Sequence, residues 1–154
     1  MLKPTILLSL GLLLAAPAFA DPLKPLEPWV REAPPGMMML GGYVRLHNPG
    51  AKEIRILGAE SSAFGAIELH KTEIVAGTAK MIQQDALAIP PGAEISLAPG
   101  GYHLMLMQPK KPLKAGDSVD ITLKLDGDAT QAVRFEVRKV TGSTPEDHSH
   151  HHHH

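Results

Sequence analysis

Imidazole and thioether side chains alternate with leucine along residues 103–107. In a β-strand successive side chains point to opposite faces, so His103, Met105 and Met107 would share one face and the two leucines the other. Thioether sulfur is soft and polarisable, and together with imidazole it selects Cu(I). A Met in a strand also commonly fills gaps in a core, and a single His is commonly a surface or hydrogen-bonded residue. This stretch alone leaves both interpretations open.

A second His and Met pair lies upstream. Gly65–Val75 alternates as a strand with its apolar residues inward, which points His70 outward. If Ala76-Gly77 forms a two-residue hairpin turn, Met81 on the returning strand is the diagonal neighbour of His70 on the same face. An odd-length turn without a bulge would reverse that parity. If the fold brings both pairs together, four donors form an N₂S₂ set: His70, Met81, His103 and Met105.

The composition of this donor set favours one metal. Zinc prefers thiolate, imidazole and carboxylate ligands, and calcium and magnesium prefer oxygen. Cu(II) prefers nitrogen and oxygen, whereas neutral thioethers favour Cu(I). The alternative is that two unrelated His lie on a surface while two Met fill gaps, and the donor types alone do not decide between them.

The composition of the chain excludes several functions. Its 154 residues contain no cysteine, which excludes thiolate zinc sites, Cys-ligated copper centres, CxxC redox motifs and Cys nucleophiles. A net charge of −1 provides no basic field, so we expect no nucleic-acid partner. No nucleophile, base and orienting group converge in the sequence, and we expect no enzymatic activity.

The first twenty residues predict export. Lys3, an apolar run and the cleavage pattern Ala18-Phe19-Ala20 are typical of a secretory signal peptide, with cleavage expected after Ala20. The run is too short to span a membrane as a helix. We therefore expect residues 21–142 to form one domain outside the cytoplasm, monomeric and without a membrane span.

Short alternating segments separated by Gly and Pro turns predict an all-β protein, an antiparallel sandwich or small barrel. Asp21–Pro28 carries three prolines and is expected to be an extended lead-in, followed by Trp29 in the core. The expected strands cover residues 42–47, 54–59, 65–75, 79–84, a segment containing Ile95 and Leu97, 103–108, 118–125 and 131–140.

Further His and Met residues receive no ligand role. Met107 is interpreted as a residue flanking the donor set or filling a gap. For Met37-Met38-Met39, loop packing is the favoured interpretation, and a docking patch or an auxiliary thioether site is the alternative. His47, beside a turn, is expected on the surface.

The spacing of the four donors is H-x10-M-x21-H-x-M, and it resembles the signature of the periplasmic CuA chaperone (PCuAC) family. The resemblance extends over nearly all of residues 29–138. Besides the motif, it rests on Trp29-Val30-Arg31, Ala33-Pro34-Pro35-Gly36, Gly42-Tyr43, Asn48-Pro49-Gly50, Glu68-Leu69-His70 and the stretch Pro99–Met107.

This resemblance implies a cupredoxin-like antiparallel Greek-key β-sandwich. It implies that Cu(I) is bound at an exposed site by His70, Met81, His103 and Met105. It also implies copper delivery toward the CuA centre of cytochrome c oxidase subunit II, alongside Sco-type proteins. Two alternatives remain open: copper buffering or resistance without directed delivery, and a structural or adhesive module without metal.

The polar tail, residues 143–154, is expected to be disordered. A terminal His run is typical of an expression tag, but the signal peptide and Asp147-His148-Ser149 favour a native extension that resembles those of some family members. Imidazole ligands without thioether suit Cu(II). The tail is therefore a candidate secondary Cu(II) site, with the residues His148, His150, His151 and His152.

Overall fold

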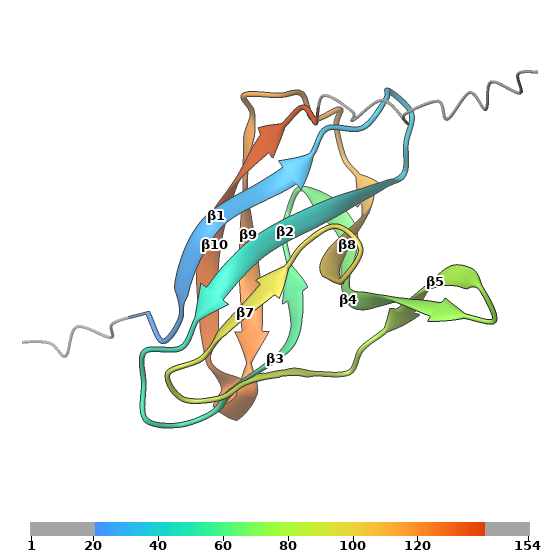
Figure 1. Ribbon diagram of the computed structural model, residues 1–154. Helices are drawn as coiled ribbons and strands as arrows, with labels where there is room; N and C mark the ends of the chain where they lie inside the picture. Colours follow the sequence, from blue (N-terminus) through green and yellow to red (C-terminus); the bar gives the residue numbers. More distant parts are fainter. Residues whose placement is uncertain (1–20, 141–154) are drawn as a thin grey trace, which may run out of the picture.

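The computed structural model describes residues 21–140, which are almost entirely β-structure (Figure 1). The predicted signal peptide and His-rich tail lie outside these residues. No helix within residues 21–140 has the length and apolar character needed to cross a membrane. The strands are β1 (Lys24–Arg31), β2 (Met39–His47), β3 (Ile54–Glu60), β4 (Phe64–Val75), β5 (Thr78–Gln83), β6 (Leu87–Ile89), β7 (Glu94–Leu97), β8 (Tyr102–Pro109), β9 (Ser118–Leu125) and β10 (Thr130–Arg138).

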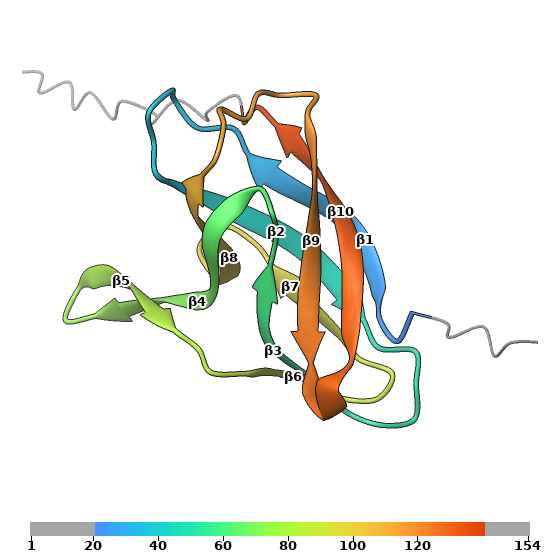
Figure 2. The same cartoon turned by 180° about the vertical axis from the view of Figure 1, so that it is seen from behind.

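The ten strands form one open sheet in the order β5-β4-β8-β7-β2-β1-β10-β9-β3-β6, with a further pairing of β8 to β2. The sheet folds over on itself, so that β2 and β7 lie in front of β9 in Figure 1 and behind it in Figure 2. This folded all-β sheet agrees with the sandwich that the alternating segments predict. The core lies between the two layers.

Alternating apolar residues supply the core. In β9 and β10 every second side chain is buried, and in β8 Leu104 and Leu106, on either side of Met105, are fully buried. Fully burying one such side chain stabilises the fold by about 1.5–3 kcal/mol. Burial of the leucines determines which face of β8 points into the core. Because side chains alternate along a strand, it also determines which side chains lie on the opposite face.

The N-terminal strand differs from the prediction. Residues 24–28 belong to β1 rather than to a lead-in, and β1 pairs in parallel with β10, so the sheet is not wholly antiparallel. Pro25 pairs with Leu46 of β2, and because only the last residues of β1 pair with β10, Pro25 has no strand paired on its other side. The register with β2 shifts around Pro28, where Glu27 has a positive φ of 50°.

Trp29 is not a core residue. It lies half-buried on the face of β1 opposite the fully buried Val30, and its ring packs on Tyr43 with centroids 4.7 Å apart. The strand parity explains the error, because only one of two adjacent residues can face the core. Strand β6 was not predicted, since its three residues are too few to give a periodic signal.

Candidate metal centre

Three adjacent strands, β5, β4 and β8, carry the four predicted ligands. His70 of β4 lies directly opposite His103 of β8, and Glu68 lies opposite Met105 in the same register. Residues directly opposite in an antiparallel pair point to the same face. His70, His103 and Met105 therefore share one face of the sheet, and this face is opposite to the one that carries the buried leucines of β8.

A two-residue turn places Met81 on that face as well. Val75 pairs with Thr78, and the two residues between them, Ala76 and Gly77, have positive φ angles of 52° and 78°. Positive φ at both positions is the requirement of a type I′ hairpin turn. Met81 consequently pairs with Thr72, one diagonal step from His70. The even-length turn predicted from the sequence is confirmed, and with it the parity of Met81.

The two imidazole rings are close enough to share an ion. Their centroids are 5.7 Å apart and the ring planes are inclined by 40°. Imidazole nitrogen binds zinc at about 2.0–2.1 Å, and a similar bond to copper would put the centroids of two rings around one ion about 5–6 Å apart. The separation in the structure fits that requirement.

Each ring is oriented by one hydrogen bond. The Nε2–H of His70 donates to the Glu68 carboxylate at 2.7 Å, and the Nδ1–H of His103 donates to the Gly101 carbonyl at 3.1 Å. A carboxylate and a carbonyl oxygen only accept, so these nitrogens carry the protons. The lone pairs are then on Nδ1 of His70 and Nε2 of His103.

Both of these nitrogens are buried without a hydrogen-bond partner among residues 21–140. A buried polar atom left unpaired costs about 1–3 kcal/mol, so native structures rarely retain one without a reason. Two such nitrogens on adjacent rings, each with its lone pair free, have the chemistry that a pair of metal ligands requires. A bound cation would satisfy both at once.

His103 is more buried than the sequence predicted. Its side chain is only 3% exposed, although it lies on the face turned away from the core. Strand β8 lies between β4 on one side and β7 and β2 on the other, and the Gly101 bond holds the ring against its own strand. Burial lowers the pKa of His103, and the neighbouring His70 lowers it further, while the Gly101 hydrogen bond opposes both effects. The lowered pKa favours the neutral ring, which is the form that binds metal.

The thioethers lie on either side of the His pair. Met105 is half-buried two residues beyond His103, and Met81 is 59% exposed on β5. Strand β5 is an edge strand with no buried residue, and it projects from the body as a two-stranded arm with the end of β4 (Figures 1 and 2). The expectation of an exposed site therefore holds for Met81 and not for His103.

No cluster of three or more His, Cys, Asp or Glu side chains suited to a metal ion occurs within residues 21–140. The donors that accompany the His pair on its face are Glu68, already bonded to His70, and the thioethers.

Sequence reasoning did not assign a role to two groups beside the site. Glu68 is two residues from His70 on the same strand, and that spacing was the available signal for a carboxylate that orients the ring. Gly41 of β2 lies opposite Met105 of β8, and the Tyr43 side chain lies over Gly41. A Cβ on residue 41 would collide with the Tyr43 hydroxyl. Glycine at position 41 thus lets the phenol occupy the space beside Met105.

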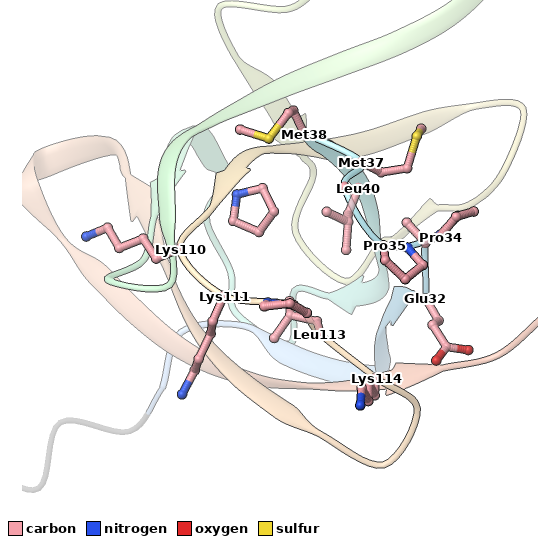
Figure 3. A pocket seen from close by; sticks show the side chains of 14 residues that line it. Glu32, Pro34, Pro35, Met37, Met38, Leu40, Lys110, Lys111, Leu113 and Lys114 are labelled. Atoms are coloured by element: carbon pink, nitrogen blue, oxygen red, sulfur yellow. The ribbon is translucent and has the colours of Figure 1, made fainter.

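The other His and Met residues lie elsewhere. His47 is half-buried at the end of β2. Loop packing of Met37–Met39 is wrong, because their side chains are 51–56% exposed. A groove of about 310 Å³ lies beside them, with Met37 and Met38 along one edge and three lysines along the opposite side (Figure 3). None of the four predicted ligands lines this groove. The tail histidines lie outside the described residues, so the Cu(II) site there stays a prediction.

Comparison with known protein families gives a match to the model "Putative lipoprotein LpqE-like" over residues 26–137. Among curated proteins, "Putative lipoprotein Lxx21020" of Leifsonia xyli subsp. xyli is 35% identical over 125 residues, which cover 80% of this chain and 74% of the relative.

Two solved structures are similar over most of the domain. The copper-bound PCuAC domain from PmoF2 has a TM-score of 0.65 and 24% identity, covering 77% of this chain and 94% of that domain. The CuI-DR1885 solution structure from Deinococcus radiodurans has a TM-score of 0.61 and 32% identity, covering 74% of this chain and 76% of the other.

Proposed function

The chain belongs to the LpqE-like, PCuAC-type family, and from this premise we propose that it is a Cu(I) metallochaperone. One Cu(I) ion is held by His70, Met81, His103 and Met105. The observation that carries the proposal is the pair of buried, unpartnered imidazole nitrogens flanked by thioethers on one sheet face. Both solved neighbours hold copper, and this supports the choice of metal.

The donor set suits a carrier. All four ligands are neutral, so the ion is held without a thiolate that an oxidising compartment would oxidise. Met81, on the exposed edge strand, is the ligand that an acceptor can displace first. His103, buried in the sheet, is the ligand that leaves last. Stepwise exchange of this kind moves copper without releasing it into water.

We further propose that the acceptor is the CuA domain of cytochrome c oxidase subunit II or a Sco-type protein, and that the protein acts in the periplasm without enzymatic activity. The His-rich tail, His148 and His150–His152, is proposed as a secondary Cu(II) site. Copper buffering without directed delivery is the alternative that the acceptor experiment distinguishes.

Anaerobic competition with a chromogenic Cu(I) chelator tests the site. The full chain should hold one Cu(I) tightly, and His103→Ala or Met81→Ala should weaken it strongly. His47→Ala is the matched control, because it removes an imidazole outside the site and should leave the affinity unchanged. Equal affinity in all four proteins would contradict the ligand assignment.

Transfer to an apo CuA domain tests the direction of delivery. Copper should reach the acceptor faster from the loaded protein than from a small-molecule Cu(I) complex at matched free copper. Tight binding without this acceleration would support buffering and contradict directed delivery.

A further inference from the structure

Four methionines remain outside the proposed site. Six Met residues follow the start residue, and none of them belongs to the buried core of residues 21–140. Because filling irregular core space is the ordinary use of Met, their surface placement needs another explanation. Two are the proposed ligands, and the others are Met37, Met38, Met39 and Met107.

Met39 and Met107 form a cross-strand pair. They lie directly opposite each other in the pairing of β2 with β8, so their side chains share a face. The backbone N–H of Gln108 donates to the Met38 carbonyl at 2.8 Å, which makes the next pair, Met39 and Met107, a non-hydrogen-bonded pair. Such pairs have the shorter Cα separation, about 4.5 Å, and the closer side chains.

Neither residue of the pair is buried. Met39 is 56% exposed and Met107 is half-buried. On the other side of Met107, β4 contributes the small, exposed Ala66. No bulky neighbour covers the pair from β4.

The pair is continuous with the proposed copper site. Met105 lies two residues from Met107 on the same strand and face, about 6.6 Å away along β8, and His103 follows at the same interval. Opposite Met105, β2 contributes Gly41, and the Tyr43 phenol lies over this glycine beside Met105. Met39, Met107 and Met105 are therefore successive neighbours on one face of the sheet, and this row of thioethers ends at the imidazole pair.

We propose that Met39 and Met107 form a second Cu(I) site, weaker than the first, from which copper passes to Met105 and the imidazole pair. The identity of the cargo rests on the proposed function. Two neutral thioethers select Cu(I), and without imidazole they hold it less tightly. Passage is ligand exchange at constant oxidation state. Met37 and Met38 do not take part, since they precede β2 and line the groove of Figure 3.

Methyl NMR of the full chain, labelled with ¹³C at the Met methyl groups and titrated anaerobically with Cu(I) acetonitrile complex, tests the proposal. The Met81 and Met105 signals should shift with the first equivalent. The Met39 and Met107 signals should shift with the second. Met39→Leu should abolish the second-equivalent shift of Met107, and Met107→Leu that of Met39, while both keep the first-equivalent shifts. Met37→Leu is the matched control and should keep all of them.

The two proposals fail differently in this titration. Unmoved Met39 and Met107 signals with normal shifts of Met81 and Met105 would overturn the second site and leave the proposed function standing. Copper bound by the tail alone would leave all Met methyl signals unmoved, and that result would overturn both. Shifts of Met39 and Met107 without shifts of Met81 and Met105 would support the thioether pair and contradict the four-ligand site.

Discussion

The two imidazole rings of the candidate site are each oriented by one hydrogen bond that leaves the other nitrogen free. Substitutions can separate these two roles. The amide nitrogen of Asn reaches the position of an imidazole Nδ1, and that of Gln reaches the position of Nε2. His103→Asn therefore keeps the donor to Gly101 and removes the free nitrogen, and His70→Gln does the same with respect to Glu68.

We expect both variants to fold and to lose tight Cu(I) binding. Circular dichroism and chelator competition on the same samples check the two parts of this prediction. Binding retained by either variant would contradict the assignment of Nε2 of His103 and Nδ1 of His70 as ligands.

Glu68→Ala should weaken Cu(I) binding by about 10–100-fold, the usual cost of losing a group that orients a ligating His. The carboxylate fixes which nitrogen of His70 carries the proton, so its loss frees the ring to rotate. Glu73→Ala is the control, because this residue is on the same strand and pairs with Lys71 away from the His pair. Chelator competition should find the control unchanged, and similar affinity for both variants would contradict the orienting role.

Stability of the apo protein should depend on His103. Burial lowers its pKa in the folded state, whereas unfolding restores a value of about 6.5. Below about pH 6.5 the unfolded state binds the proton first, so the free energy of unfolding falls as the pH is lowered toward the folded pKa. Urea unfolding of wild type and His103→Asn between about pH 7.5 and pH 5 measures this. The free energy of unfolding of wild type should fall relative to that of His103→Asn as the pH is lowered. A difference between the two proteins that does not change with pH would contradict the lowered pKa of His103.

At the residue scale, residue types and spacing selected the four proposed donors, and the structure places them on one face of three adjacent strands. The sequence did not reveal that His103 is buried, since strand parity determines the face of a residue but not what surrounds it. Nor did it reveal which imidazole nitrogens are free, because this depends on the local bonds to Glu68 and Gly101.

Among the elements, the β4–β5 hairpin determines whether Met81 belongs to the site. Its two-residue turn puts Met81 on the face of His70 and Ile82 on the other face. The double variant Met81→Leu/Ile82→Met keeps the number of thioethers and moves one across the strand. We expect it to bind Cu(I) as weakly as Met81→Leu alone, measured by chelator competition. Recovery of wild-type affinity by the double variant would show that the face does not matter.

Most strands were predictable because turns and alternation agree, as in β9, where every second residue is buried and the bounds match those predicted. The failures have physical causes. In β1 the prolines masked a strand that a register shift accommodates, and β6 is too short to show a period. The turn at Ala76-Gly77 was predicted from the two residue types alone. The structure gives Ala76 a positive φ, which is uncommon for a residue other than glycine.

For the molecule as a whole, the sheet order brings together residues that are far apart in sequence. Strands β4 and β8 are adjacent because β8 inserts between β4 and β7. Alternation within one strand contains no information on this order, and only the resemblance to a family implied that the two His and Met pairs come together. The result is a buried imidazole on an interior strand of the sheet and an exposed thioether on a projecting arm (Figure 1).

X-ray absorption spectroscopy of the full chain, loaded anaerobically with one equivalent of Cu(I), tests the shared site most directly. The account predicts two imidazole nitrogens and two sulfurs around the copper, with one sulfur lost in Met81→Leu and one nitrogen lost in His103→Asn. A copper ion surrounded by nitrogen and oxygen alone, or a sulfur number unchanged in Met81→Leu, would contradict it.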